Sequence, residues 1–324
     1  MNEIGRAFLR AFAVCTVAVA VTATGAAGAR VPAAKQTTAL TPVTVAVVPI
    51  EPTAQAIYAK DEGFFRRQGL DVKIVLVTQP QQAIQSVLTG DADFSSTSIG
   101  GLALLKLRGI PFRVVGAGSL HRPKAPTSAL IAAPGVRITR PRDIVGKKIG
   151  LDAENQLAHI GLLTWLKRNG MSGSDVHLTY GVPFSDMLGP LLHHDFDAIV
   201  IPEPFLTEAL QKGAKMIYPV LTSVCPHDCL STAWLARKNV DRDVAARFRN
   251  AIQPASVWAN KKRTKPASAV ILSKYSGVKA SVIGKTTRVT FATRLRPAMA
   301  QPWLDAYAEF GVIPQSYPAI DLVK

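Results

Sequence analysis

Residues 90–109 read GDADFSSTSIGGLALLKLRG. Residues 93–95 predict a brief strand, and the mostly apolar segment 98–107 that follows predicts a helix. Gly109 stands just beyond that helix, where glycine commonly ends helices because it tolerates a positive φ. A strand that leads directly into a helix is the repeating unit of an α/β fold. The stretch therefore predicts an α/β protein.

The same unit recurs on both sides of this stretch. Further strands are predicted at 43–48, 72–77, 112–117, 129–133, 148–151, 176–180, 197–201 and 215–218, and further helices at 80–88, from 139 and at 156–168. Strands that alternate with helices in this way form mostly parallel sheets. The pattern predicts two doubly wound lobes, one for each series of strands.

Two polar stretches interrupt the alternation, at 120–126 and 220–229. We interpret them as two crossings that join the lobes and act as a hinge. Ligands of open α/β sheets bind beyond the carboxyl ends of the strands, so we expect a ligand cleft between the lobes. The expected boundaries are 42–122 with 222–324 for lobe 1, and 123–221 for lobe 2.

The N-terminus has the three parts of a secretory signal peptide. Arg6 and Arg10 precede an uncharged apolar stretch at 11–24, and Ala27-Gly28-Ala29 supplies a small-residue cleavage site. We expect residues 1–29 to be removed and residues 30–41 to form a leader, so that the mature protein lies in the periplasm and does not span the membrane. Lipidation of Cys15 is the weaker alternative, because the preceding residues make a poor lipobox.

The chain is long and strongly basic. Its 324 residues are enough for two lobes, and 38 Lys and Arg against 22 Asp and Glu give a net charge of +16. Such a charge is compatible with a nucleic-acid partner. The basic residues are scattered, however, and the densest run, at 261–265, is short. A solvated basic surface is therefore the preferred interpretation, with no nucleic-acid partner.

Only Cys225 and Cys229 remain after signal cleavage, in the stretch Cys-Pro-His-Asp-Cys. In an oxidising compartment a pair this close predicts a loop disulfide. A metal site that includes His227 is the alternative, but it lacks a fourth ligand nearby. We expect no metal and no cofactor.

Four segments, in this order along the chain, carry a family resemblance. They are AKDEGFF (59–65) with GLDV (69–72), GDADFS (90–95), PRDIVGKKIG (141–150), and FDA (196–198) with PEP (202–204). Together they resemble the nitrate/sulfonate/taurine group of ABC-importer substrate-binding proteins, which includes binders of thiamine-pyrimidine precursors. The resemblance implies a type II periplasmic-binding fold and the permease subunits of an ABC importer as partners. The chain departs from the family pattern at Asp152–Asn155, where Gly-Ser is frequent, and at Pro202, where an aromatic residue is common.

Three expected loops at strand ends carry hydrogen-bonding side chains: 49–53, 95–98, and 152–156 with His159 one turn on. Hydroxyl groups and the N–H groups of a helix start suit an oxyanion or a carboxylate, whereas acidic groups suit an amine, an amidine or a heterocycle. Helix capping by the serines, a capping neighbour at the histidine and surface or hinge roles for the carboxylates remain open. The candidate ligand-binding residues are Glu51, Thr53, Ser96, Thr97 and Ser98 in lobe 1, and Asn155, His159 and Glu203 in lobe 2.

We predict an exported, monomeric solute-binding protein that delivers a small organic or inorganic ion to an ABC importer. The ion would resemble a sulfonate, nitrate, taurine or a heterocycle. One alternative is a sensory ligand-binding module. The other is an enzyme of the pyrimidine-precursor-synthase type on the same fold, although the cysteine-rich signature of that family is absent. The sequence also lacks the Gly-x-Ser-x-Gly and His-Glu-x-x-His motifs of common hydrolases. We therefore predict no enzymatic activity.

Overall fold

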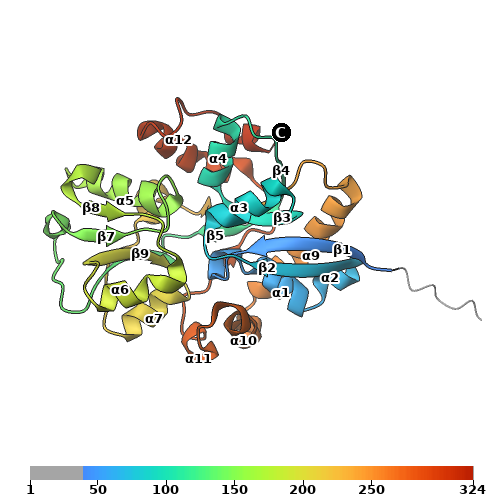
Figure 1. Ribbon diagram of the computed structural model, residues 1–324, viewed down its shortest axis with the longest axis horizontal. Helices are drawn as coiled ribbons and strands as arrows, with labels where there is room; N and C mark the ends of the chain where they lie inside the picture. Colours follow the sequence, from blue (N-terminus) through green and yellow to red (C-terminus); the bar gives the residue numbers. More distant parts are fainter. Residues whose placement is uncertain (1–38, 324) are drawn as a thin grey trace, which may run out of the picture. The chain divides into compact units, whose positions relative to one another are not determined.

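The computed structural model describes residues 39–323 (Figure 1). The predicted signal peptide, 1–29, and the first part of the leader lie outside the described residues. The leader was predicted to end at residue 41, and the first strand, β1, begins at Thr41. Within residues 39–323, no helix is long and apolar enough to cross a membrane.

The first sheet has five strands in the order β2-β1-β3-β12-β4. β1 pairs in parallel with β2 and β3, whereas β12 pairs antiparallel with β3 and β4, so four strands share one direction and β12 is reversed. The elements are β1 (Thr41–Val47), α1 (Gln55–Asp61), α2 (Phe64–Arg67), β2 (Leu70–Leu76), α3 (Pro80–Thr89), β3 (Phe94–Ser98), α4 (Ile99–Leu107), β4 (Arg113–Ala117), β12 (Thr232–Ala236) and α9 (Arg242–Ala259).

Helices cover both faces of this sheet (Figure 1). Alternate residues of β1 show the two faces: Val45 and Val47 belong to the apolar cluster with Ile57 of α1, whereas Ala46 belongs to the cluster with Leu102 of α4. The side-chain period of two in a strand explains this division. β12, whose five residues are all buried, shows the same burial on both faces.

The second sheet also has five strands, in the order β10-β6-β9-β7-β8. β7 pairs in parallel with β8 and β9, and β6 runs antiparallel to its neighbours β9 and β10. Figure 1 shows α5 on one side of this sheet and α6 and α7 on the other. The elements are β6 (Ser128–Ala132), β7 (Lys148–Gly150), α5 (Leu157–Arg168), β8 (His177–Thr179), α6 (Leu188–Leu192), β9 (Ala198–Pro202), α7 (Phe205–Gln211) and β10 (Lys215–Tyr218).

A small third sheet marks the passage between the two halves of the fold. Its order is β11-β5-β13, formed by β5 (Ser119–His121), β11 (Cys229–Leu230) and β13 (Thr290–Phe291). The chain leaves the first sheet through β5 and returns to it through α8 (Leu221–Val224) and β11. These two passages coincide with the predicted crossings at 120–126 and 220–229.

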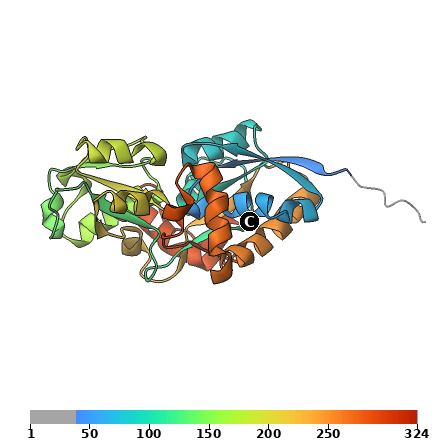
Figure 2. The same cartoon turned by 90° about the horizontal axis from the view of Figure 1, so that it is seen from below.

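The C-terminal helices pack against both halves. α10 (Lys265–Ser276) contacts α1 and α11 (Ala280–Ile283) contacts α7, while α12 (Gln301–Glu309) contacts α4 and α5. In both views the elements of the two large sheets form separate groups (Figures 1 and 2). The predicted fold class is therefore confirmed: two α/β halves, each built on a sheet with one dominant strand direction. The reversed strands β6 and β12 were not predicted to be reversed, and β12 was not predicted as a strand.

Candidate ligand-binding site

A cavity of about 110 Å³ lies between the two large sheets, at the carboxyl ends of β1, β3, β7 and β9. This is the edge at which ligands of α/β sheets bind. Its apolar wall is formed by Val48, Ile50, Pro52, Pro80, Leu120, Leu157, Ala158, Phe184, Val200, Pro202 and Leu221. Its polar wall is formed by Thr53, Ser96, Thr97, Ser98, Ser119, His121, Thr127, Ser128, Asp152, Gln156, Ser231 and Thr232.

The hydroxyl run that was predicted in lobe 1 does line the cavity. β3 extends to Ser98, so Ser96 and Thr97 are strand residues and not the loop residues we expected. Ser98 caps α4 by accepting from the N–H of Gly101 over 2.9 Å, which confirms the capping interpretation. Ser96 Oγ and Thr97 Oγ1 are buried and have no hydrogen-bond partner among the described residues. Such unpartnered buried hydroxyls are costly unless a ligand or water bonds them.

Thr53 is the fourth predicted residue at the cavity. Its hydroxyl donates to the carbonyl oxygens of Val48 and Ile50, which follow β1. The side chain therefore shapes the loop that follows β1 while its remaining surface lines the cavity wall.

His159 and Asn155 do not line the cavity, although the loop between β7 and α5 does. The N–H of Asn155 donates to His159 Nδ1 over 3.0 Å, and Nε2 lies 3.0 Å from the hydroxyl of Tyr180. Burial lowers the pKa of His159 to about 4, so the ring is neutral at pH 7 and Nε2 carries the proton. The hydroxyl of Tyr307 donates to the carbonyl of Asn155 over 2.8 Å. His159 and Asn155 thus fix a loop whose other members, Asp152 and Gln156, line the cavity.

Glu51 is buried and does not line the cavity. Its Oε1 lies 2.7 Å from Arg288 Nε, in an ion pair that is almost wholly buried. Burial raises the pKa of the Glu51 carboxyl, and the charge of Arg288 opposes that rise. The backbone N–H of Glu51 donates to the carbonyl of Glu203 over 3.0 Å, which joins the loop after β1 to the end of β9.

Glu203 is also buried and is also absent from the cavity wall. Its two carboxyl oxygens accept from the backbone N–H and the hydroxyl of Thr207, at 2.9 and 2.8 Å. Burial raises its pKa to about 7, and the bonds from Thr207 act in the opposite direction. The preceding residue, Pro202, lines the cavity instead.

Asp152 is the acidic residue that lines the cavity, and it was not among the predicted site residues. It is 3% exposed, and its Oδ1 has no hydrogen-bond partner within the described part of the chain. Burial raises its pKa to about 7, while bonds from its own N–H and that of Ala153 act to lower it.

Eight polar residues of the wall were missed in all: Ser119, His121, Thr127, Ser128, Asp152, Gln156, Ser231 and Thr232. His121 lies within the predicted first crossing and Thr127 directly follows it, and Asp152 and Gln156 belong to a loop that was predicted to face the ligand. The positions of these four residues in the sequence could have identified them as site residues. Ser231 directly precedes β12 and Thr232 begins it, and because that strand was not predicted, no pattern indicated that these two residues reach the cavity.

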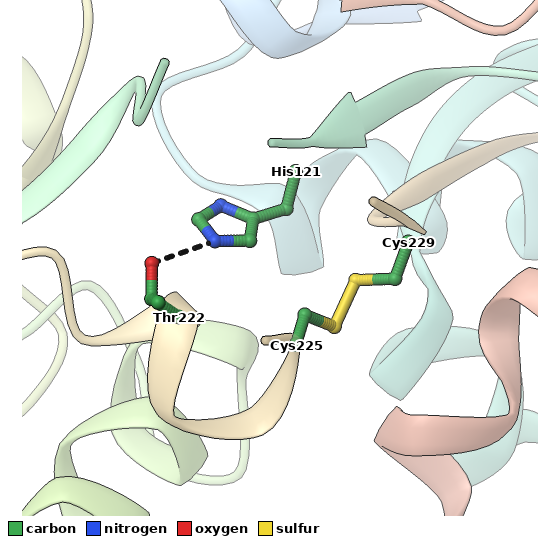
Figure 3. The surroundings of a disulfide bond; sticks show 4 residues. All are labelled: His121, Thr222, Cys225 and Cys229. Atoms are coloured by element: carbon green, nitrogen blue, oxygen red, sulfur yellow. Dashed lines mark hydrogen bonds between the residues drawn. A yellow bond between two sulfur atoms is a disulfide. The ribbon is translucent and has the colours of Figure 1, made fainter. Parts of the chain in front are cut away.

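Cys225 and Cys229 form the predicted disulfide (Figure 3). Neither cysteine lines the cavity, but two nearby residues do. Leu221 begins α8, the helix that ends just before Cys225, and His121 of β5 pairs with Cys229 of β11. His121 Nε2 lies 3.0 Å from the hydroxyl of Thr222, as Figure 3 shows. Among residues 39–323 no group of three or more His, Cys, Asp and Glu could hold a metal ion.

Burial also lowers the pKa of His121, to about 4, against a weaker opposing effect of Asp228. The ring is therefore neutral at pH 7. A neutral imidazole with Thr222 beside Nε2 adds hydrogen-bonding capacity to the cavity wall without adding charge.

Residues 52–262 match the family model described as NMT1/THI5 like. A comparison with curated proteins finds no match. Three solved structures are similar in fold at low sequence identity. The ligand-binding component of an ABC-type import system from Staphylococcus aureus is 14% identical with a TM-score of 0.73, and the alignment covers 87% of this chain and 95% of that one.

The other two are named for anions. The periplasmic aliphatic sulphonate binding protein SsuA from Escherichia coli is 18% identical with a TM-score of 0.68, over 87% of this chain and 97% of that one. The periplasmic nitrate-binding protein NrtA from Synechocystis is 16% identical with a TM-score of 0.71, over 88% and 85%. At these identities the similarity shows the periplasmic-binding fold.

Proposed function

The chain belongs to the NMT1/THI5-like family, and we propose that it is an exported solute-binding protein that captures one small molecule and delivers it to an ABC importer. The observation that carries this proposal is the cavity between the two sheets. Its wall contains buried polar atoms from both halves that have no hydrogen-bond partner among residues 39–323: Ser96, Thr97 and Ser231 from the first half, and Asp152 from the second. Groups from both halves are needed if a ligand is to favour a closed state over an open one.

Three hydrogen bonds between the halves surround the cavity. Ser98 donates to Gln156 over 2.8 Å, Gln79 Nε2 donates to the carbonyl of Gly181 over 2.7 Å, and Glu51 meets Glu203 through the backbone. These contacts support a closed state that encloses a solute and opens about the two crossings. In this proposal lobe 1, at 42–122 and 222–324, and lobe 2, at 123–221, move as two bodies.

The cavity wall supports binding without chemistry. No Cys or Lys nucleophile lines the cavity in the part of the chain that the structure describes. His121 does line the cavity, and its ring lies beside the hydroxyl of Thr222 and within the electrostatic influence of Asp228. Among the described residues, however, no hydrogen bond joins His121 to a serine hydroxyl of the wall, as a catalytic Ser–His pair would require. We therefore propose a monomeric periplasmic receptor whose partners are its solute and the permease subunits of an importer. The importer-associated and periplasmic neighbours support this assignment.

A thermal-shift experiment with a blocked cavity tests the proposal. Ala158 is half-buried at the start of α5 and lines the cavity, so Ala158→Trp should fill it. Ala267→Trp, at an exposed position of α10, is the matched control. A solute present at 100 times its Kd should stabilise the wild type by about 2.7 kcal/mol. We expect fractions of a metabolite extract to raise the melting temperature of the wild type and the control, but not of Ala158→Trp. Equal shifts in all three proteins, or none in any, would contradict the proposal.

A further inference from the structure

The charge of the cavity wall differs from what an anion site requires. Among the described residues that line it there is no Lys or Arg, and Asp152 is the one carboxylate. The other titratable group of the wall, His121, is neutral at pH 7 because burial lowers its pKa. Arg288 is not part of the cavity wall, and it is already paired with Glu51 at 2.7 Å. A nitrate or sulfonate in this cavity would face a carboxyl group without a compensating cation.

At the start of α4, two of the N–H groups that could receive an anion are already bonded. Ile99, the first residue of α4, donates its N–H to the carbonyl of Ser231 over 2.9 Å. The N–H of Gly101 is taken by Ser98 Oγ over 2.9 Å. The positive end of a helix binds anions chiefly through free N–H groups, and these two are occupied.

The wall atoms that lack hydrogen-bond partners within residues 39–323 instead favour a ligand that donates hydrogen bonds. Asp152, Ser96, Thr97 and Ser231 are 3%, 5%, 1% and 7% exposed, and each has a side-chain oxygen without a partner within residues 39–323. A carboxylate only accepts hydrogen bonds, whereas a hydroxyl can donate or accept. A ligand that donates hydrogen bonds can therefore satisfy all four groups, and a positively charged donor also favours the ionised form of Asp152, whose pKa burial raises to about 7.

We propose that Asp152 is the specificity-determining residue of the cavity and that it selects a small organic solute with a protonated nitrogen, of the amine or amidine class. The inference rests on the proposed function, because it takes the cavity to be the solute site. The carboxylate of Asp152 accepts from the cationic nitrogen, and the hydroxyls of Ser96, Thr97 and Ser231 bond the remaining polar atoms. The carbon part of the solute packs on the apolar wall, which includes Phe184, Leu157 and Pro202. Charge-assisted bonds of this kind are the strong ones in a buried site.

Calorimetric titration with matched pairs of probes tests the proposal. Each pair differs in the cationic nitrogen and little else: benzamidine against benzamide, and cyclohexylamine against cyclohexanol. Nitrate and ethanesulfonate serve as the anions. The proteins are the wild type, Asp152→Asn and Asp195→Asn, which removes an exposed carboxyl of the second half outside the cavity wall. Circular dichroism confirms that each variant is folded before titration.

We expect at least one amine or amidine to bind the wild type at least tenfold more tightly than its neutral partner. Asp152→Asn should lose at least tenfold in affinity for that probe, and Asp195→Asn should stay within twofold. Tighter binding of nitrate or ethanesulfonate than of any cation, equal binding within each pair, or no binding of any cation would overturn the proposal. The thermal-shift contrast between Ala158→Trp and Ala267→Trp is independent of solute charge, so its survival or loss shows whether the proposed function fails as well.

Discussion

The hydroxyl of Ser98 donates to the side-chain oxygen of Gln156 over 2.8 Å, and these two residues are the N-caps of α4 and α5. One helix belongs to the first half of the fold and the other to the second. Both residues line the cavity, so the bond joins the two walls directly. Near the same cavity Gln79 donates to the carbonyl of Gly181 over 2.7 Å. In the proposed closed state these two bonds join the halves across the cavity.

Removing both bonds should therefore favour the open state. A typical hydrogen bond contributes about 0.5–1.5 kcal/mol, so Gln79→Ala with Gln156→Ala, which leaves the Ser98 cap of α4 in place, should shift the closed–open equilibrium by about 1–3 kcal/mol. The measurement is a pulsed-EPR distance between spin labels placed at Lys73 of β2 and Lys215 of β10, both exposed. We expect a longer and broader distance in the double variant than in the parent protein. Ser86→Ala removes a bond within α3 alone and is the control, and distances that agree in all three proteins would contradict the assignment.

Asp152 gives stability a pH dependence that a variant can isolate. Burial raises its pKa to about 7 from an ordinary value of 3.8. Between these values the folded protein keeps a proton that the unfolded chain has released, so this carboxyl lowers the free energy of unfolding as the pH rises, and the loss is complete above pH 7. The difference corresponds to at most about 4 kcal/mol. Asp152→Asn should consequently melt higher than the wild type at pH 8, by more than it does at pH 4.5.

Asp195→Asn is the reference for that comparison, because this carboxyl is exposed and lies outside the cavity wall. Glu203 has a pKa raised in the same direction and stays in every protein, so the wild type and Asp152→Asn share its contribution. A stability offset between Asp152→Asn and the wild type that is the same at both pH values would contradict the buried, proton-retaining carboxyl.

The disulfide should stabilise the return crossing. Closing a ring as short as Cys225 to Cys229 is worth about 2 kcal/mol in the chain-entropy description. Urea unfolding of Cys225→Ala with Cys229→Ala should show a loss of that order, and reduced wild type should show the same loss. Protein recovered from an oxidising compartment should not react with iodoacetamide until it is reduced. Labelling of both thiols without reduction would contradict the bond.

Export makes a prediction about the N-terminus. The charged, apolar and small-residue parts of 1–29 place the cleavage after Ala29, so the mature protein should begin at Arg30 or within a few residues of it. Intact-mass measurement of protein from the periplasmic fraction checks this. A full-length chain with Met1 that stays in the cytoplasm would remove the premise of export.

Local patterns were enough to predict most strands between residues 41 and 218, and they predicted α3, α4 and α5 among the helices there, whereas α1, α2, α6 and α7 were not predicted. The predicted helix at 80–88 is α3, Pro80–Thr89, because its amphipathic pattern and its terminal glycine are both local signals. β12 was missed because all five of its residues are buried, so its sequence shows no alternation of polar and apolar residues. The strand also joins the first sheet only after the chain has formed all the strands of the second sheet. No local signal tells where such a strand pairs.

The predicted loops do contribute to the cavity wall, but only some of the residues that line it were predicted. The sequence indicated that the loop after β7 faces the cavity, but His159 and Asn155 turned out to hold that loop while Asp152 and Gln156 line the wall. Glu51 looked like a free acid because its partner, Arg288, is distant in the sequence and close in space. Partners of buried charges are set by tertiary packing, which periodicity and motifs do not report.

Native mass spectrometry of the mature protein tests the central claim most directly. The wild type, Ala158→Trp and the control Ala267→Trp are equilibrated with the same metabolite extract and exchanged into volatile buffer. The mass of each intact complex is then measured. We predict one added small molecule per chain on the wild type and on Ala267→Trp, and none on Ala158→Trp, because the added side chain occupies the cavity. A small molecule retained equally by Ala158→Trp, or no added mass on the wild type at any extract concentration, would contradict the claim that this cavity captures a solute.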